Sequence, residues 1–421
     1  MRYYGTRDKN KFYTLQEAAK SGLAPCGGLY MPESIPQIDL KKLEEEAEKS
    51  FADMAYYVAD LIFGEDMDKA QLKDIIFDAY NFALPLHQFG DSDKFTLELF
   101  HGPTLAFKDF GARFMSRMLS ALRGDKKTII LTATSGDTGS AVADGFYGVE
   151  GIDVYILFPE GKVSDFQERQ MTTLGGNIHA LRVDGSFDDC QAMVKEVFAN
   201  HELCAAKNIT SANSISILRW VPQSFYYFWG YIQWKKATGK TECDVVVPSG
   251  NFGNITAAIL AYKMGLPLRK FVAATNSNDT IPQFLKTKVY TPKPTVATCA
   301  NAMDVGNPSN YERLVELMSW EELSEKMVGL SYTDEEIEKT MGEIYEKYGY
   351  LSCPHSAVGY AAMCDTGVEG FYASTAHSSK FADVIERAVG VTVDIPDSHK
   401  GIMTKEKISN PLGRHDLETI L

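Results

Sequence analysis

A repeated pattern that begins near residue 95 most constrains what this chain can fold into. Short apolar runs end in glycine-rich turns, and each turn leads into a stretch with helical periodicity. This order is typical of βα units that build a parallel sheet. The clearest strands are expected at Thr128–Ala133, Val154–Phe158, Ile178–Val183, Asp244–Val247, Phe271–Thr275 and Phe371–Ser374. The sequence therefore predicts an α/β fold.

The chain has 421 residues, which is enough for about two to three domains. Before the βα pattern begins, helical periodicity covers Leu15–Ala19, Leu40–Lys49 and Met54–Phe63, and no catalytic motif occurs. A dense aromatic segment that ends at Lys236 divides the α/β region. We therefore predict three domains: a mainly helical domain at 1–95 and two α/β domains at 96–236 and 237–421.

Charge and cysteine content limit the partners and the compartment. Acidic residues outnumber basic residues by 56 to 42, and the net charge of −14 opposes binding to nucleic acid or an anionic membrane. The seven cysteines contain no Cys-x-x-Cys pair, which suits free thiols in a reducing compartment. No signal segment or long apolar run is present, so we expect a cytoplasmic protein. The histidines show no ligand spacing, so no metal site is predicted.

The first chemically informative turn follows the expected strand at 128–133. Its sequence is TSGDTGS, at residues 134–140. Backbone N–H groups and hydroxyls at a helix N-terminus favour negative charge, so Ser135 and Thr138 are candidates to bind a carboxylate. Ordinary N-cap chemistry is the structural alternative, because Ser, Thr and Asp cap many helices.

The second turn has the sequence PSGNFGN, at residues 248–254. Gly250 and Gly253 permit positive φ and close approach of the backbone to a phosphate, while Asn251 and Asn254 add donors. The turn lacks the third glycine of a dinucleotide motif and the Gly-Lys-Ser/Thr ending of a triphosphate loop. It is therefore a candidate phosphate cradle, and an ordinary βα connection is the alternative.

The third motif places a single lysine among apolar residues. Lys108 follows Leu105, Ala106 and Phe107, and Phe110 stands two residues later. Burial of an amine lowers its pKa and leaves more of the free base that attacks a carbonyl. Lys108 is therefore the candidate nucleophile. The alternative is a lysine whose stem covers the aromatic rings while its ammonium reaches water.

Taken together, these motifs resemble the threonine synthases of the longer bacterial and fungal type. The resemblance rests first on FHGPTLAFKDFG at 100–111, TATSGDTG at 132–139 and PSGNFG at 248–253. Further matches are SANSI at 211–215, AATN at 273–276, NAMDV at 301–305 and TAH at 375–377. The matching runs follow one another in order over nearly the whole chain.

This resemblance implies a pyridoxal-phosphate enzyme of fold type II, in which two parallel-sheet α/β domains hold the cofactor between them. The implied activity is a lyase-type β,γ-replacement, the last step of threonine biosynthesis, which converts O-phospho-L-homoserine and water to L-threonine and phosphate. Lys108 matches the lysine that carries the cofactor and then acts as a base. Thr375 matches the hydroxyl that faces the pyridine nitrogen. The loop that binds the cofactor phosphate is matched by Gly250, Asn251, Phe252, Gly253 and Asn254.

The substrate groups are implied in the same way. Ser135 and Thr138 match the loop that receives the substrate carboxylate, and Asn213, Ser214 and Arg219 match the substrate-phosphate site. A forked guanidinium suits phosphate oxygens. The structural alternative for the phosphate site is a capped helix start with the arginine on a solvated face. Relatives of this type are often monomeric, so a monomer is expected and a dimer is the alternative.

Two departures and two classes of rival function stay open. Asp137 stands where relatives in the wider fold often have Asn, and Ser216 stands where family members often have Asn. The nearest rival activities are β-elimination from serine or threonine and β-replacement to form cysteine. A second phosphate site around Arg219 favours a phosphorylated substrate. A non-catalytic binding protein is the other rival, and an intact Lys108 argues against it.

Overall fold

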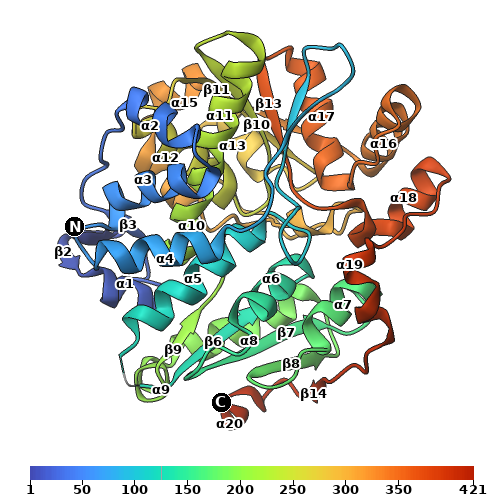
Figure 1. Ribbon diagram of the computed structural model, residues 1–421. Coiled ribbons are helices and arrows are strands. Elements are labelled where there is room, and N and C mark those ends of the chain that lie inside the picture. Colours follow the sequence, from blue (N-terminus) through green and yellow to red (C-terminus); the bar gives the residue numbers. More distant parts are fainter. Residues whose placement is uncertain (125) are drawn as a thin grey trace. The chain divides into compact units, whose positions relative to one another are not determined.

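The computed structural model describes residues 1–124 and 126–421 (Figure 1). The chain forms two compact units, and each unit is composed of separate chain segments. Unit 1 consists of Met1, Met31–Phe107 and Trp220–Asp394, and unit 2 consists of Arg2–Tyr30, Lys108–Arg219 and Ile395–Leu421. This division differs from the three contiguous domains expected from the sequence, which remain a prediction.

Unit 1 is built on a six-stranded sheet with the strand order β12-β11-β10-β13-β5-β4. The strands are β4 (Leu86–Gln88), β5 (Phe95–Glu98), β10 (Cys243–Pro248), β11 (Leu268–Thr275), β12 (Met327–Ser331) and β13 (Gly370–Ser374). All neighbouring pairs are parallel except β4 and β5, which are antiparallel. The central strands β10 and β13 are buried along their whole length, and their apolar sequences are those that a parallel sheet covered on both faces requires.

Helices cover the unit 1 sheet, and three of them are apolar nearly all round. Of these three, α11 and α12 contact β10, and α17 contacts β10 and β13 (Figure 1). Helices that are apolar all round belong to the interior of a protein. The helices are α2 (Leu40–Ala47), α3 (Phe51–Phe63), α4 (Lys69–Ala79), η1 (Val221–Ser224), α11 (Phe225–Thr238), α12 (Gly253–Lys263), α13 (Thr280–Thr287), η2 (Asn301–Met303), α14 (Tyr311–Leu317), α15 (Trp320–Lys326), α16 (Asp334–Tyr348), α17 (Pro354–Thr366), η3 (Ser378–Phe381) and α18 (Ala382–Val389).

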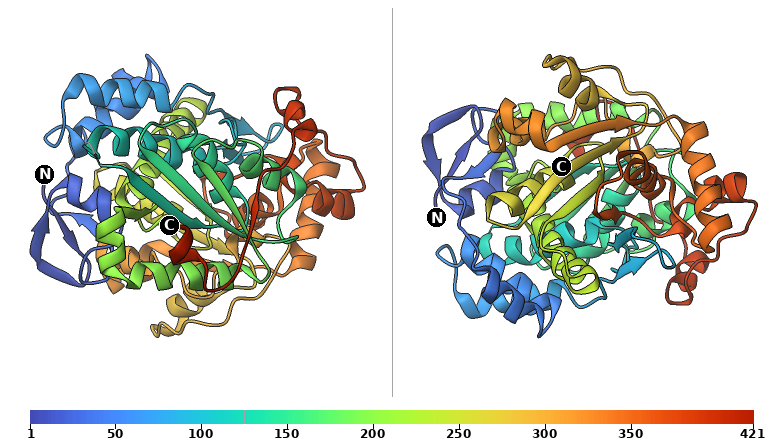
Figure 2. Two further views of the ribbon diagram at one scale, coloured as in Figure 1. Left: turned by 90° about the horizontal axis from the view of Figure 1, so that it is seen from below. Right: turned by 90° about the horizontal axis from the view of Figure 1, so that it is seen from above.

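Unit 2 contains a fully parallel five-stranded sheet with the order β14-β8-β7-β6-β9 (Figure 2). The strands are β6 (Thr128–Ala133), β7 (Ile152–Pro159), β8 (Ile178–Val183), β9 (Ile209–Ser211) and β14 (Asn410–Leu412). One face forms an apolar cluster with residues of α8 and α20. On the other face, α6 lies close to β7, and a Cβ added at Gly139 would meet the Ile156 side chain.

The remaining elements of unit 2 lie at both ends of the sequence and between the strands. An antiparallel pair, β1 (Tyr3–Gly5) and β2 (Asp8–Tyr13), precedes the first helix. The helices are α1 (Leu15–Ser21), α5 (Lys108–Leu122), α6 (Asp137–Phe146), α7 (Asp165–Thr172), α8 (Phe187–Ala199), α9 (His201–Lys207), α19 (Asp397–Lys400), η4 (Gly401–Thr404) and α20 (Leu417–Ile420). Two short elements, β3 (Tyr30–Pro32) and α10 (Ile217–Trp220), lie where the chain passes from one unit to the other.

The structure confirms the α/β fold and all six strands expected from the sequence. The expected N-terminal helices are present as α1, α2 and α3. Helical periodicity did not indicate β1 and β2, because β2 is mostly exposed and polar and has no apolar alternation. The aromatic segment expected at a domain boundary forms α11 inside unit 1.

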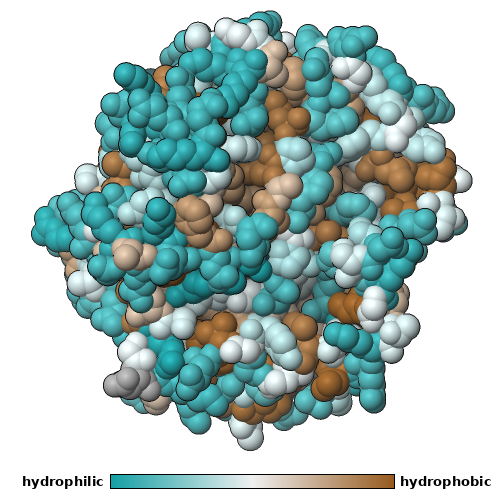
Figure 3. Space-filling view, in the orientation of Figure 1, coloured by the Kyte–Doolittle hydropathy of each residue, from teal (hydrophilic) through white to brown (hydrophobic). Residues whose placement is uncertain are grey.

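The surface is largely polar. Figure 3 shows hydrophilic residues over most of one face, with apolar patches between them. Within the described residues, the exposed large apolar side chains are Phe12, Phe77, Tyr147, Val289, Val296, Val315, Val328, Ile408 and Ile420. None of the helices in this part of the chain combines the length and the apolar character needed to span a bilayer.

Candidate active site

Three neighbouring strands of unit 1 end in the motifs that the sequence singled out. β5, β13 and β10 lie side by side, with Ser374 opposite Glu98 and Tyr372 opposite Val246. The lysine motif follows β5, Thr375 follows β13, and the glycine turn follows β10. Ligands of α/β proteins bind at the carboxyl ends of parallel strands. Unit 1 therefore brings Thr375, the glycine turn and the segment that leads to Lys108 to one edge of its sheet.

The glycine turn is held close to a neighbouring backbone. A Cβ added at Gly250 would lie 2.6 Å from the Cα of Met303, so only glycine fits there without displacing main chain. Phe252 has a φ of 61°, a left-handed conformation that costs energy in a residue with a side chain. α12 begins at the next residue, so its N-terminal N–H groups face the turn. This arrangement suits a bound anion.

Asn254 supplies a side-chain donor beside this turn. Its Oδ1 accepts hydrogen bonds from the hydroxyls of Tyr226 at 2.5 Å and Tyr227 at 2.6 Å. Burial raises the pKa of both tyrosines well above the ordinary value, so both hydroxyls stay protonated donors. The Nδ2 of Asn254 is buried and has no hydrogen-bond partner among the described residues. A phosphate oxygen would satisfy this N–H group, so the turn fits the phosphate of a cofactor.

Asn251 has a different role in the contacts of this turn. Its Oδ1 accepts from the backbone N–H of Ser309 at 2.6 Å, and its backbone oxygen accepts from Asn310 Nδ2 at 3.0 Å. These bonds join the turn to the loop that precedes α14. They fix the conformation of the turn through residues that lie far away in the sequence.

Thr375 is fixed through its backbone. Its N–H donates to Ser356 Oγ at 3.0 Å, and its carbonyl accepts from the N–H of Phe107 at 2.8 Å. The Thr375 side-chain hydroxyl is buried, and no described residue forms a hydrogen bond with it. A buried hydroxyl without a protein partner suits a polar atom of a ligand. The ring nitrogen of a cofactor would be such an atom.

The segment that leads to Lys108 is held against the same part of unit 1. Ala106 forms an antiparallel bridge with Ala376, and the N–H of His377 donates to the carbonyl of Leu105 at 3.0 Å. Leu105 has a φ of 60°, which is a second strained position beside a candidate site residue. Lys108 is half-buried and begins α5 of unit 2.

Two histidines in the matched motifs form local contacts. His101 lies 2.7 Å from Glu98 Oε2 and contacts the ring of Phe100. Burial would raise the pKa of Glu98, but hydrogen bonds from His101 and Tyr350 hold it below the ordinary value. His377 caps η3 by accepting from the N–H of Ser379. Leaving both histidines out of the catalytic set stays a prediction.

In unit 2, the loop after β6 exposes two hydroxyls. Thr134 Oγ1 accepts from the N–H groups of Gly136 at 2.9 Å and Gly139 at 2.8 Å, which fixes the turn. Ser135 and Thr138 are half-buried, and neither hydroxyl forms a hydrogen bond with another described residue. Both therefore have donors for an external group.

The loop after β9 lies next to this loop because β6 and β9 are adjacent parallel strands. The Thr132 hydroxyl donates to Oδ1 of Asn213, which leaves the amide Nδ2 as the donor end of that side chain. Ser214 is half-buried in the same loop. Ser216 is fully buried, and its hydroxyl has no partner within the described part of the chain.

Arg219 is buried, with 4% of its surface exposed, so the alternative of a solvated arginine is wrong. Its Nη1 donates to the carbonyl of Ala212 at 2.6 Å. A Cβ added at Gly111 of α5 would lie 2.9 Å from its Nε, so the guanidinium packs against the helix that Lys108 begins. Burial lowers the pKa of Arg219 to about 10, against the opposing effect of Asp109. Arg219 is therefore a buried cation at neutral pH.

One residue beside the loop after β6 was missed by the sequence analysis. Gln167 donates from Nε2 to Asp137 Oδ1 at 2.9 Å, in the first turn of α6. The only local signal is the spacing of Ser164 and Gln167, which form a capping box at the start of α7. That spacing indicates a helix start and gives no sign of a contact with Asp137.

Comparison with known proteins gives matches along the whole chain. Residues 88–373 match the family model described as pyridoxal-phosphate dependent enzyme. Residues 2–80 match the model described as threonine synthase N terminus, and residues 356–420 match that described as threonine synthase, C-terminal.

Individual relatives agree with these matches. The threonine synthase of Escherichia coli strain K12 is 42% identical over 421 residues, covering 99% of this chain and 96% of that protein. The threonine synthase of Saccharomyces cerevisiae is 34% identical, covering 99% and 96%. The chain also resembles the crystal structure of PLP-bound threonine synthase from Brucella melitensis, with a TM-score of 0.93, 32% identity and coverage of 100% and 98%.

Proposed function

We infer the reaction from one premise, that the chain belongs to the threonine synthase family of pyridoxal-phosphate-dependent enzymes. The reaction is the conversion of O-phospho-L-homoserine and water to L-threonine and phosphate. One observation supports this assignment best: the lysine motif, Thr375 and the glycine turn end three adjacent strands of one sheet. The distance in sequence between these motifs makes this grouping a property of the fold.

The residues of unit 1 would hold the cofactor at its two ends. The turn from Gly250 to Asn254 would bind the phosphate, and the Thr375 hydroxyl would face the ring nitrogen. When bound, pyridoxal phosphate supplies an electron sink for negative charge at the substrate Cα. Lys108 would carry the cofactor covalently, and its half-buried position beside Leu105, Ala106 and Phe107 places the side chain in partly apolar surroundings.

Lys108 would also move the protons of the reaction. Its free amine would act as the base for the Cα proton of the substrate and later for a Cβ proton. The strained and hydrogen-bonded segment from Leu105 to Phe107 limits the motion of the backbone before it. A base that is held in this way loses little entropy when it meets the proton.

The substrate would be bound by unit 2. Ser135 and Thr138 would donate to its carboxylate, since both hydroxyls are half-buried and have no partner among the described residues. Asn213, Ser214 and Arg219 would bind its phosphate. Arg219 is a buried cation, and a charge in dry surroundings stabilises a departing phosphate more strongly than one in water.

The proposed reaction is tested with the purified protein, pyridoxal phosphate and O-phospho-L-homoserine. We expect phosphate and L-threonine to form in equal amounts. Phosphate release without threonine, or faster deamination of serine or threonine, would assign the chain to a rival reaction of the same cofactor. We also propose a cytoplasmic monomer. The seven free thiols support the compartment, and light scattering tests the oligomeric state.

A further inference from the structure

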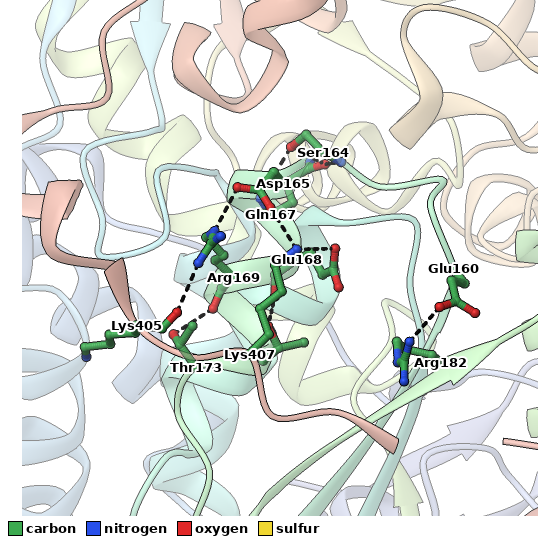
Figure 4. A network of polar contacts seen from close by, with 11 residues as sticks. Glu160, Ser164, Asp165, Gln167, Glu168, Arg169, Thr173, Arg182, Lys405 and Lys407 are labelled. Carbon is green, nitrogen blue, oxygen red and sulfur yellow. Dashed lines mark hydrogen bonds and ion pairs between the residues drawn. The ribbon is translucent and has the colours of Figure 1, made fainter. Parts of the chain in front are cut away.

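A short segment near the C-terminus is bound to α7 of unit 2. We call residues Lys405–Ile408 the C-terminal strap. Lys407 Nζ lies 2.7 Å from Asp165 Oδ1 and 2.8 Å from Glu168 Oε2 (Figure 4). The Lys407 side chain is 30% exposed and that of Glu168 is 19% exposed, so this ion pair is partly shielded from solvent, whereas the Asp165 side chain is 51% exposed. Such pairs are less screened by salt than fully exposed ones.

Backbone groups add to this attachment. Arg169 Nη1 donates to the carbonyl of Lys405 at 3.0 Å, and Arg169 Nε also donates to Asp165 at 2.8 Å. At the end of α7, the N–H of Ile408 donates to the carbonyl of Thr172 at 2.6 Å. The strap is therefore bonded to both ends of this two-turn helix.

The same helix carries Gln167, whose side chain is fixed at both ends. Its Oε1 accepts from the N–H and the hydroxyl of Ser164, at 3.3 and 3.1 Å. Because a backbone N–H can only donate, this bond identifies the amide oxygen and assigns Nε2 to the opposite side. Nε2 donates to Asp137, and Gln167 is only 1% exposed.

Gln167 also contacts the backbone of the loop that carries the proposed carboxylate donors. A Cβ added at Gly136 would lie 2.6 Å from its Cδ, and Gly136 has a φ of 137°, which favours glycine. Gly136 and Asp137 are the two residues between Ser135 and Thr138. The Gln167 amide therefore fills the space beneath this part of the loop and bonds to the first residue of α6.

We propose that Gln167 is a positioning residue for substrate binding, and that the C-terminal strap holds the helix that carries it. The proposal rests on the function inferred for Ser135 and Thr138. If the strap or the amide is loosened, the two hydroxyls lose their fixed spacing. The glycine turn of unit 1 does not depend on these contacts. The expected signature is a raised KM for O-phospho-L-homoserine, with the cofactor retained.

The first experiment replaces the Gln167 amide by a carboxylate and then exchanges donor and acceptor between Gln167 and Asp137. Gln167→Glu keeps an acceptor for Ser164 but places a second carboxylate against Asp137. We expect KM to rise about tenfold, since a hydrogen bond to a charged group is replaced by repulsion. Asp137→Asn in the same chain restores an N–H···O bond in the opposite direction, and KM should return to within about threefold of the original value.

Each single variant and the double variant are measured, together with the visible absorption of bound cofactor and the thermal midpoint. An unchanged KM in Gln167→Glu would overturn the proposal. A double variant with a KM no lower than that of Gln167→Glu would overturn it as well, because a purely structural defect would persist.

The second experiment loosens the strap with a matched control. Lys407→Met removes both ion pairs to α7 and should raise KM about threefold, which is the scale of partly shielded ion pairs. Arg182→Met is the control, because Arg182 pairs with Glu160 at 2.6 Å elsewhere in unit 2 (Figure 4). Equal changes of KM in the two variants would overturn the role of the strap. A wild-type protein that forms no threonine would instead contradict the proposed function, whatever the variants do.

Discussion

The carboxyl edges of the two parallel sheets present different polar groups. In unit 1, the groups available to a ligand are deeply buried, since Asn254 and Thr375 are each only 6% exposed. In unit 2, Ser135 and Thr138 are half-buried. Arg219, with 4% of its surface exposed, is the deeply buried member of the unit 2 groups. The comparison teaches that the same βα geometry can present a buried edge, which we propose as the anchor of the cofactor, and half-exposed hydroxyls, which we propose as part of the exchange site of the substrate.

The two edges are also stiffened by different means. In unit 1, two buried tyrosine hydroxyls hold Asn254, and backbone bonds hold Thr375. In unit 2, the loop depends on Thr134 and on the amide of Gln167. We therefore expect changes at the glycine turn and Thr375 to release the cofactor and changes at the loop after β6 to weaken substrate binding.

The largest effect should come from Lys108→Ala, which removes the residue that would serve cofactor and substrate alike. We expect kcat to fall about ten-thousandfold, the upper range for loss of an acid–base group. The visible absorption of the covalently held cofactor should disappear, and borohydride should no longer fix it. Lys195→Ala, an exposed lysine of α8, is the control and should keep both properties. Persisting activity in Lys108→Ala would contradict the assignment.

Gly250→Ala should affect cofactor binding at the unit 1 edge and leave the unit 2 edge unchanged. The new Cβ would lie 2.6 Å from the Cα of Met303, and neither backbone can yield cheaply. We expect pyridoxal phosphate to bind about a hundredfold more weakly, as a loss of about 3 kcal/mol implies. Absorbance titration with the cofactor measures this. Gly342→Ala in α16 is the control, because its Cβ would meet Ala388 at an ordinary 3.7 Å. Equal cofactor affinity in both variants would show that the glycine turn does not bind the phosphate of the cofactor.

Ser135→Ala and Thr138→Val should show the opposite pattern. Each removes one proposed hydrogen bond to a carboxylate, so we expect KM to rise about tenfold in each variant. Cofactor affinity should not change, because the glycine turn belongs to unit 1. Steady-state kinetics and the same absorbance titration check both points. Loss of the cofactor in either variant would contradict the proposal that this loop binds the substrate and not the cofactor.

The last effect concerns the stability of the segment that supports the glycine turn, and it depends on pH. Asp304 follows Met303, and burial raises its pKa to about 7, although hydrogen bonds from Thr298 and Asn276 act in the opposite direction. A carboxyl whose pKa is raised on folding stabilises the native state fully below its unfolded pKa, and this contribution is lost as pH rises to about 7. Urea denaturation should show stability falling by up to about 1.4 kcal/mol per pH unit between pH 5 and 7 from this group.

In Asp304→Asn this part of the slope should vanish, while other groups keep their contributions. The comparison of slopes does not depend on how much the substitution changes stability at any single pH. Identical slopes in the two proteins would show that Asp304 ionises normally, and the support of the glycine turn would then be independent of pH.

Much of the fold could be predicted from the sequence, because parallel strands that are buried on both faces are continuous apolar runs. The grouping of the glycine turn with Thr375 follows from the rule that loops at the carboxyl ends of adjacent strands meet. The tyrosine pair on Asn254 could not be predicted. Tyr226 and Tyr227 lie in α11, far from the turn in sequence, and an aromatic helix gives no sign of which residue its hydroxyls contact.

The substrate side was less predictable for a related reason. Gln167 and Asp137 lie in different helices, and their bond depends on how α7 packs on α6. Arg219 is buried, although its spacing from a helix start by itself favours a solvated face. Local patterns indicate where a loop begins, but side-chain partners across the fold depend on tertiary packing.

The edge strand β14 has a consequence for synthesis on the ribosome. It pairs with β8 through Asn410 and Leu181, so translation must add most of the chain before that pairing can form. At ordinary elongation rates this interval is on the order of ten seconds or more. During that time the outer hydrogen-bonding groups of β8 are open to other strands, which is a risk of aggregation. We therefore expect the growing chain to be more prone to aggregation before β14 has paired with β8 than after it.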